Sequence, residues 1–299
     1  RRFGGPVRAE RASSEARGST QRGLFIAGNG EALPGVFRAF YSICHHLSHR
    51  IASGLLLPSL VSAGFLAVAV FFFLYGYGLQ KSYITKSDGY KKGFLLKRLP
   101  GIVFPYLVFI LIYWAANAMR GTVYSWKDVL TSLVNGDPIV TYSWYILTIL
   151  VFYLFYWLFM IACRNRSKRI ILYGCAWYVV WALFCYKMKY GVWWYNASHL
   201  LVVGIAWASY EENILRFIEK RYSILTPILW ICFFILFACC NKLESLPYAR
   251  ATEALLYVLD LVTSVVFVCC VLLLSMKVKI GNRILGFFGE ISLEIYLIQ

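Results

Sequence analysis

Long apolar segments, separated by short polar and basic ones, recur along most of the chain. A helix that crosses a bilayer needs about 20 apolar residues. Segments that approach this length predict spans at 60–80, 100–118, 143–162, 170–186, 192–210, 223–240, 254–275 and 284–299. A shorter segment at 37–49 is expected to form an additional first helix. The pattern therefore predicts an all-α fold, a polytopic transmembrane bundle of about nine helices.

Residues 1–36 differ from the rest of the chain. They are rich in Gly, Ser, Ala and Arg, and they lack the central apolar stretch of a secretory signal peptide. We expect a disordered or foreign leader there, followed by one transmembrane domain over residues 37–299. Because the sequence stops at "GEISLEIYLIQ", within an apolar segment, this domain is expected to be truncated at both ends.

Composition supports a membrane protein. Hydrophobic residues make up 60% of the chain and charged residues 15%, against roughly 25% charged residues in soluble domains. The net charge of +16 could indicate nucleic-acid binding, but the basic residues occur in short blocks between apolar segments. We therefore expect membrane lipids and no nucleic acid as partners, and a multi-pass protein of the cytoplasmic (cell) membrane.

The basic blocks also predict an orientation. Residues 81–98, 164–169, 216–221 and 277–283 carry roughly twice as many basic residues as the alternating connections between them. Cytoplasmic connections of membrane proteins are enriched in Lys and Arg. The four blocks are therefore expected on the cytoplasmic side, and residues 119–142 outside.

Three of the four histidines lie in "AFYSICHHLSHR", residues 39–50. On a helix His45 and His49 share a face, and His46 lies three residues from His49. Such imidazoles suit general acid–base chemistry, because their pKa lies near neutrality. A metal site and a plain interfacial position are the alternatives. None of the nine cysteines has zinc-site spacing with a histidine, so no metal site is predicted.

Three further features could carry chemistry or packing. In "KKGFLLKRLPGIVFPYLVF", Arg98 would lie at the cytoplasmic boundary, where it could bind an anion such as phosphate or simply fix the orientation. Gly76 and Gly78 would allow a close helix approach or a bend. Asp260 falls in mid-span, where a carboxylate would serve ion coupling or an interhelical hydrogen bond.

Together these stretches resemble the acyltransferase 3 family of multi-pass membrane proteins, which acylate cell-envelope sugars and related hydroxyl acceptors. The resemblance runs in order through "FRAFYSICHHLSHRI", "AGFLAVAVFFFLYGYGLQKSY", "FLLKRLPGIVFPYL", "SWYILTILVFYLFYWL", "HLLVVGIAWASYEE" and "FFGEISLEIYLIQ". It covers residues 37–299.

The resemblance implies an O-acyltransferase, expected to move an acetyl group from acyl-CoA to a saccharide hydroxyl, with no tightly bound cofactor. In the family a basic residue precedes an essential histidine by eleven positions. A count from Arg38 gives His49, whereas the family's "HH" pair gives His46. We rank His46 first, His49 second and His45 third.

The resemblance also implies that Arg98, with Lys97, holds the phosphates of the donor. The sequence differs from the family pattern at three positions. Gly101 stands where the second arginine of a pair is expected, Tyr75 stands where a serine is common, and Gln299 stands where relatives often have histidine. The alternative function is a carrier or permease without covalent chemistry, for which Asp260 would be the coupling residue.

Overall fold

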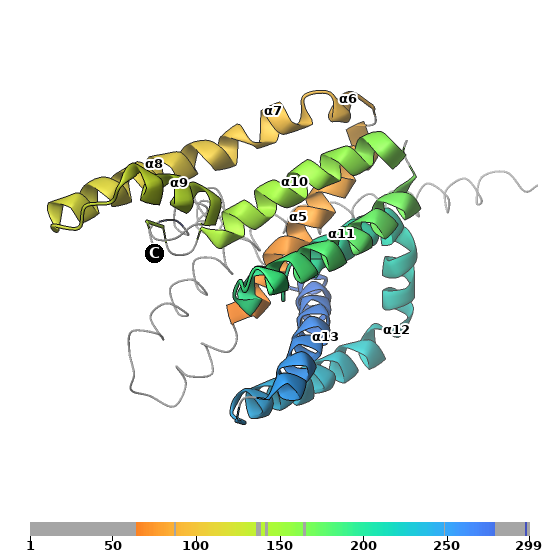
Figure 1. Cartoon of the computed structure of the whole chain (residues 1–299). Coiled ribbons are helices and arrows are strands. Elements are labelled where there is room, and N and C mark those ends of the chain that lie inside the picture. The colour runs from red at the N-terminus through yellow and green to blue at the C-terminus, as the bar shows by residue number, and fades with distance from the viewer. Residues whose placement is uncertain are drawn as a thin grey trace, which may run out of the picture.

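All regular elements that the structure describes are helices (Figure 1). The computed structural model describes residues 64–86, 88–135, 139–140, 143–163, 166–247, 249–278 and 297. Within them, six helical segments are long and apolar enough to cross a membrane. The all-α transmembrane class is thereby confirmed, and the count of about nine helices is not. The leader, the predicted first helix and nearly all of 284–299 lie outside the described residues.

The helices follow the apolar segments closely. Their bounds are α5 Gly64–Lys86, α6 Asp88–Lys91, α7 Phe94–Arg98, α8 Pro100–Met119, α9 Trp126–Asn135, α10 Trp144–Cys163, α11 Ser167–Lys187, the 3₁₀ turn η2 Val192–Trp194, α12 His199–Glu244 and α13 Arg250–Ser275. The predicted spans 100–118 and 143–162 therefore match α8 and α10 to within one residue at each end. Pro100 occupies the first turn of α8, where its missing N–H costs no hydrogen bond.

Helix α12 corrects one prediction. Residues 211–222 were expected to form a loop between two spans, but they are helical and belong to the 46-residue α12, which bends along its course. The segment contains neither Gly nor Pro, and its Glu, Lys and Arg residues favour the helix. The helix is instead kinked at Tyr210, whose φ of −122° and ψ of 18° are not helical. Figure 1 shows α12 bending and returning along α13.

Helices α5 and α12 pack backbone against backbone. A Cβ atom added at Gly76 would overlap the carbonyl oxygen of Leu201, and one added at Gly204 would overlap that of Phe73. Small residues permit this approach in membranes, where dispersion contacts rather than water drive helix association. The predicted close approach is confirmed at Gly76, whereas Gly78 has nothing within 4 Å of its added Cβ.

Two of the predicted cytoplasmic connections, 81–98 and 164–169, meet at one end of the bundle. The Gln80 side chain donates to Ser167 Oγ over 3.2 Å, which joins the end of α5 to the start of α11. We call this end the basic end. At the opposite end, the Trp144 and Trp194 rings lie 6.2 Å apart.

Helix α9 lies in the connection predicted to be outside. Ser125 and Asp128 cap its start, since both the backbone N–H and the hydroxyl of Ser125 donate to the Asp128 carboxylate over 2.8 Å. These hydrogen bonds stabilise the charged form and so lower the pKa of Asp128. The Tyr106 hydroxyl donates to the Ser132 carbonyl over 2.8 Å, so α9 is also tied to α8.

Candidate functional site

Part of the predicted site lies outside the described residues. This part comprises His45, His46 and His49 and the basic candidate Arg38, so their roles stay predictions. The structure does describe Lys97, Arg98 and Asp260, and it brings only the first two together. No group of three or more His, Cys, Asp or Glu side chains with metal-site geometry occurs among the described residues.

Arg98 lies at the basic end, at the end of the short helix α7. Its guanidinium donates to the Tyr90 hydroxyl over 3.3 Å and also interacts with Tyr153 and Tyr75. Partial burial disfavours the charge, but the three tyrosines outweigh it and raise the pKa of Arg98. The guanidinium is thus a half-buried cation that aromatic side chains orient.

The tyrosines around Arg98 belong to a continuous aromatic layer. The Phe94 ring lies 5.3 Å from Tyr90 and 5.9 Å from Tyr153, and the Tyr75 and Tyr153 rings are 6.3 Å apart. Tyr75, the residue that replaces the family's serine, therefore contributes to the surroundings of Arg98. Lys97 is exposed beside this layer. At Gly101, where the family has its second arginine, an added Cβ would meet open space.

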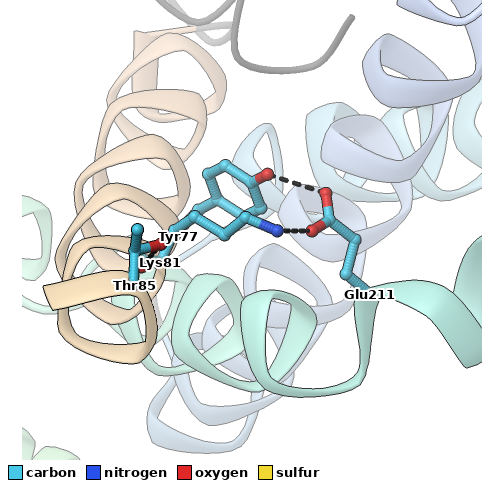
Figure 2. A network of polar contacts seen from close by, with 4 residues as sticks. All are labelled: Tyr77, Lys81, Thr85 and Glu211. Carbon is cyan, nitrogen blue, oxygen red and sulfur yellow. Dashed lines mark hydrogen bonds and ion pairs between the residues drawn. The ribbon is translucent and has the colours of Figure 1, made fainter. Parts of the chain in front are cut away.

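A buried carboxylate also lies at the basic end. Glu211 of α12 is 6% exposed, accepts a 2.7 Å hydrogen bond from the Tyr77 hydroxyl and forms an ion pair with Lys81 (Figure 2). Figure 2 shows both donors reaching from α5 to the two oxygens of the carboxylate, while Thr85 bonds to the backbone of Lys81. Glu211 directly follows the kink at Tyr210. The ion pair therefore fixes the bend of α12 against α5.

Sequence reasoning missed this ion pair. Lys81 was counted only as a charge that orients the chain, and Glu211 was assigned to a loop. The available signal was a "YEE" motif at the end of an apolar segment, which gave no indication of burial. The pairing partner lies 130 residues away, so no local spacing could identify it.

Hydrogen bonds extend this network into the bundle. Gln80 is fully buried, accepts a 2.8 Å hydrogen bond from the Tyr156 hydroxyl and donates to Ser167. Three helices, α5, α10 and α11, are thereby joined beside the Lys81–Glu211 pair. A hydrogen-bonded polar layer of this kind stabilises the geometry of the basic end.

Asp260 lies elsewhere, away from Arg98. Its carboxylate accepts a 3.4 Å hydrogen bond from the Asn196 amide, which joins α13 to the turn before α12. Near it, His199 Nε2 is 3.2 Å from the Leu261 carbonyl oxygen. His199, the fourth histidine of the chain, was not among the predicted site residues, because nothing in its local sequence distinguishes it.

The geometry of the basic end fits the binding of an anionic group. It presents an oriented arginine, nearby lysines and aromatic side chains, and it holds its only described buried carboxylate, Glu211, in an ion pair. Guanidinium groups bind phosphates through charge-assisted hydrogen bonds. Such an end could hold a phosphorylated donor molecule.

The comparison with protein families identifies the class of the protein. A family model described as an acyltransferase domain, that of the acyltransferase 3 family, matches residues 37–299. The chain belongs to this family, and it is a multi-pass membrane acyltransferase. Comparisons with curated proteins and with solved structures gave no match. The resemblance seen in the sequence is thereby confirmed.

Proposed function

We propose that the protein transfers an acyl group, in particular acetyl, from acyl-CoA to a hydroxyl of an envelope or extracellular saccharide. The observation that carries the proposal is the position of Arg98, half-buried and oriented by tyrosines at the basic end of a chain from an acyltransferase family. The phosphates of coenzyme A carry the negative charge that this end would attract. Lys97, exposed beside Arg98, adds a second positive charge to the donor site.

The orientation supports a cytoplasmic donor. The basic connections 81–98 and 164–169 share the basic end, and the positive-inside rule assigns that end to the cytoplasm, where acyl-CoA is found. The acceptor would then approach from the other side of the cytoplasmic membrane. Membrane lipids surround the apolar helix faces.

The chemical step needs a group that removes the proton of the acceptor hydroxyl. His46, with His49 and then His45 as alternatives, is the proposed base or assists passage of the acyl group. The hydroxyl oxygen attacks the carbonyl carbon of the thioester, the new C–O bond forms and the C–S bond breaks. The coenzyme A thiolate leaves, and it takes up a proton. No metal or tightly bound cofactor takes part in this scheme.

An acetyl-transfer assay tests the proposal. Membranes that contain the protein are incubated with acetyl-CoA labelled in the acetyl group and with a panel of soluble saccharides. We expect label in at least one saccharide, together with saccharide-dependent release of free coenzyme A. Membranes from cells without the protein serve as the control. Label that stays on coenzyme A with every saccharide would contradict the proposal.

A further inference from the structure

A second polar cluster lies between helices α11, α12 and α13, toward the end opposite to the basic end. Its members are Tyr178, Asn196, His199, Tyr257 and Asp260, and we call it the outer polar cluster. Asp260 lies ten residues after the start of α13, and His199 begins α12. Neither Arg98 nor the Lys81–Glu211 pair contributes to it. Polar and ionisable side chains within a membrane domain are expensive, and they usually mark a functional site.

The direction of one hydrogen bond determines what Asn196 can still bind. Its side-chain amide nitrogen donates to Asp260 Oδ2 over 3.4 Å. The amide oxygen, Oδ1, can only accept a hydrogen bond. Asn196 is 7% exposed, and among the described residues this oxygen has no hydrogen-bond partner. Asn196 therefore presents a buried, unsatisfied acceptor.

The same reasoning applies to His199. Its Nε2 atom lies 3.2 Å from the Leu261 carbonyl oxygen and 3.4 Å from the Ser264 hydroxyl oxygen. Because a carbonyl can only accept, the tautomer with the hydrogen on Nε2 is the one that satisfies this contact. The Ser264 hydroxyl donates to the same carbonyl over 2.9 Å. The other ring nitrogen of a neutral imidazole, Nδ1, then has a free lone pair. It is buried, and no described residue donates to it.

Aromatic side chains surround these two acceptors. The Tyr178 ring lies 5.5 Å from the His199 ring, and its hydroxyl is 2.6 Å from that of Tyr257. The Tyr195 and Tyr257 rings are 5.2 Å apart. Buried acceptors require donors, and the hydroxyl groups of a saccharide are neutral donors of this kind. Aromatic faces suit the apolar C–H faces of a sugar ring.

We infer that the outer polar cluster binds a hydroxyl-bearing ligand, with His199 Nδ1 and Asn196 Oδ1 accepting hydrogen bonds from its hydroxyl groups. This inference rests on the proposed function, in which the ligand is the saccharide acceptor. It assigns the acceptor to the end opposite to the donor. Asp260 acts through Asn196, because its carboxylate orients the amide so that Oδ1 faces the ligand.

Saccharide-dependent thermal stability tests the inference without requiring activity. The protein in lipid nanodiscs is heated with methyl glucoside, N-acetylglucosamine or neither, and unfolding is followed by intrinsic fluorescence. A ligand that binds only the folded state raises the melting temperature. His199→Phe keeps the ring contact with Tyr178 but removes Nδ1, and loss of such an acceptor should weaken binding about tenfold or more.

Two further variants keep the test decisive. His199→Gln can donate to the Leu261 carbonyl and still accept a hydrogen bond, so it should retain most of the shift. Tyr222→Phe removes a hydrogen bond between α12 and α13 outside the cluster, and it should leave the saccharide shift unchanged. If His199→Phe fails to fold, Asn196→Leu replaces it in the comparison.

The outcomes separate the inference from the proposed function. A saccharide shift that His199→Phe or Asn196→Leu abolishes supports the site, even if no acetyl transfer from acetyl-CoA is found. The absence of any shift in the wild-type protein would overturn the inference, whatever the transfer assay gives. An equal shift in the wild type and in His199→Phe would overturn it as well, because the saccharide would then bind elsewhere.

Discussion

Gly76 of α5 and Gly204 of α12 lie at a helix crossing that has no room for a side chain at either position. An added Cβ at Gly76 would overlap the backbone of α12, and one at Gly204 would overlap the backbone of α5. Along α12, the crossing comes before the kink at Tyr210, and Glu211 follows the kink. Glu211 then contacts Tyr77 and Lys81 of α5. Packing at the two glycines and the ion pair therefore hold the same pair of helices together.

Enlarging either glycine should disrupt this crossing. Gly204→Val must push apart two backbones, and overpacking of this kind is expected to destabilise the protein by about 3 kcal/mol or more. The matched control is Gly78→Ala, because an added Cβ there meets nothing, and its effect should stay below about 1 kcal/mol. Thermal unfolding in detergent measures both variants. Equal stability of Gly204→Val and the wild type would contradict the backbone contact.

Mutation of Lys81 and mutation of Glu211 should lower the stability of the protein by unequal amounts. Lys81→Met leaves the buried Glu211 carboxylate with Tyr77 as a donor but without its counter-charge, which should cost about 2–3 kcal/mol. Glu211→Gln keeps an acceptor for Tyr77, and Lys81, whose side chain is 42% exposed, can turn to water. That variant should lose about 1 kcal/mol. Lys92→Met, at an exposed lysine, is the control. The reverse order of stabilities would show that Glu211 does not depend on Lys81.

The orientation of the protein in the membrane can be tested with cysteines that replace two exposed lysines. Lys127→Cys lies in α9, in the connection predicted outside, and Lys168→Cys lies at the basic end. A membrane-impermeant maleimide added to intact cells should label the first and spare the second, because the basic end is expected in the cytoplasm. Labelling of the wild-type protein gives the background from its native cysteines. Preferential labelling of Lys168→Cys would reverse the orientation and remove the cytoplasmic donor site.

Arg98 should matter for the donor rather than for the acceptor. Arg98→Ala removes a charge-assisted phosphate contact, so KM for acetyl-CoA should rise about tenfold or more while KM for the saccharide changes little. Arg98→Lys should recover only part of the loss, since lysine lacks the planar fork. Lys97→Ala should have the smaller effect, because exposed charges are screened by salt. An unchanged KM for acetyl-CoA in Arg98→Ala would contradict the donor assignment.

Apolar periodicity predicts most of the described fold. Spans of about 20 apolar residues locate α8 and α10 almost to the residue, because the thickness of the bilayer sets the helix length. The same criterion ends a span at residue 210, where α12 is kinked, but it assigns residues 211–222 to a loop, since it registers a drop in hydropathy but not helix propensity. The charged residues 211–222 leave the apolar pattern while they continue the helix.

Sequence reasoning identifies site residues less well than helices. Arg98 is a predicted site residue because it combines a charge, a membrane boundary and a family motif. Glu211, Asn196 and His199 carry no such local signal, and their importance depends on partners 62 to 134 residues away. Those contacts arise from helix packing, which the order of apolar segments does not determine.

We propose that the protein acetylates a saccharide with His46 as the essential histidine. The most direct measurement is mass spectrometry of envelope saccharides from cells that express either the wild-type protein or His46→Ala at equal levels in the membrane. Loss of a general base typically lowers a rate about 10²- to 10⁴-fold. The account therefore predicts an acetyl mass increment on a saccharide in the wild-type cells and its absence with His46→Ala. Identical saccharide masses in the two strains would contradict it.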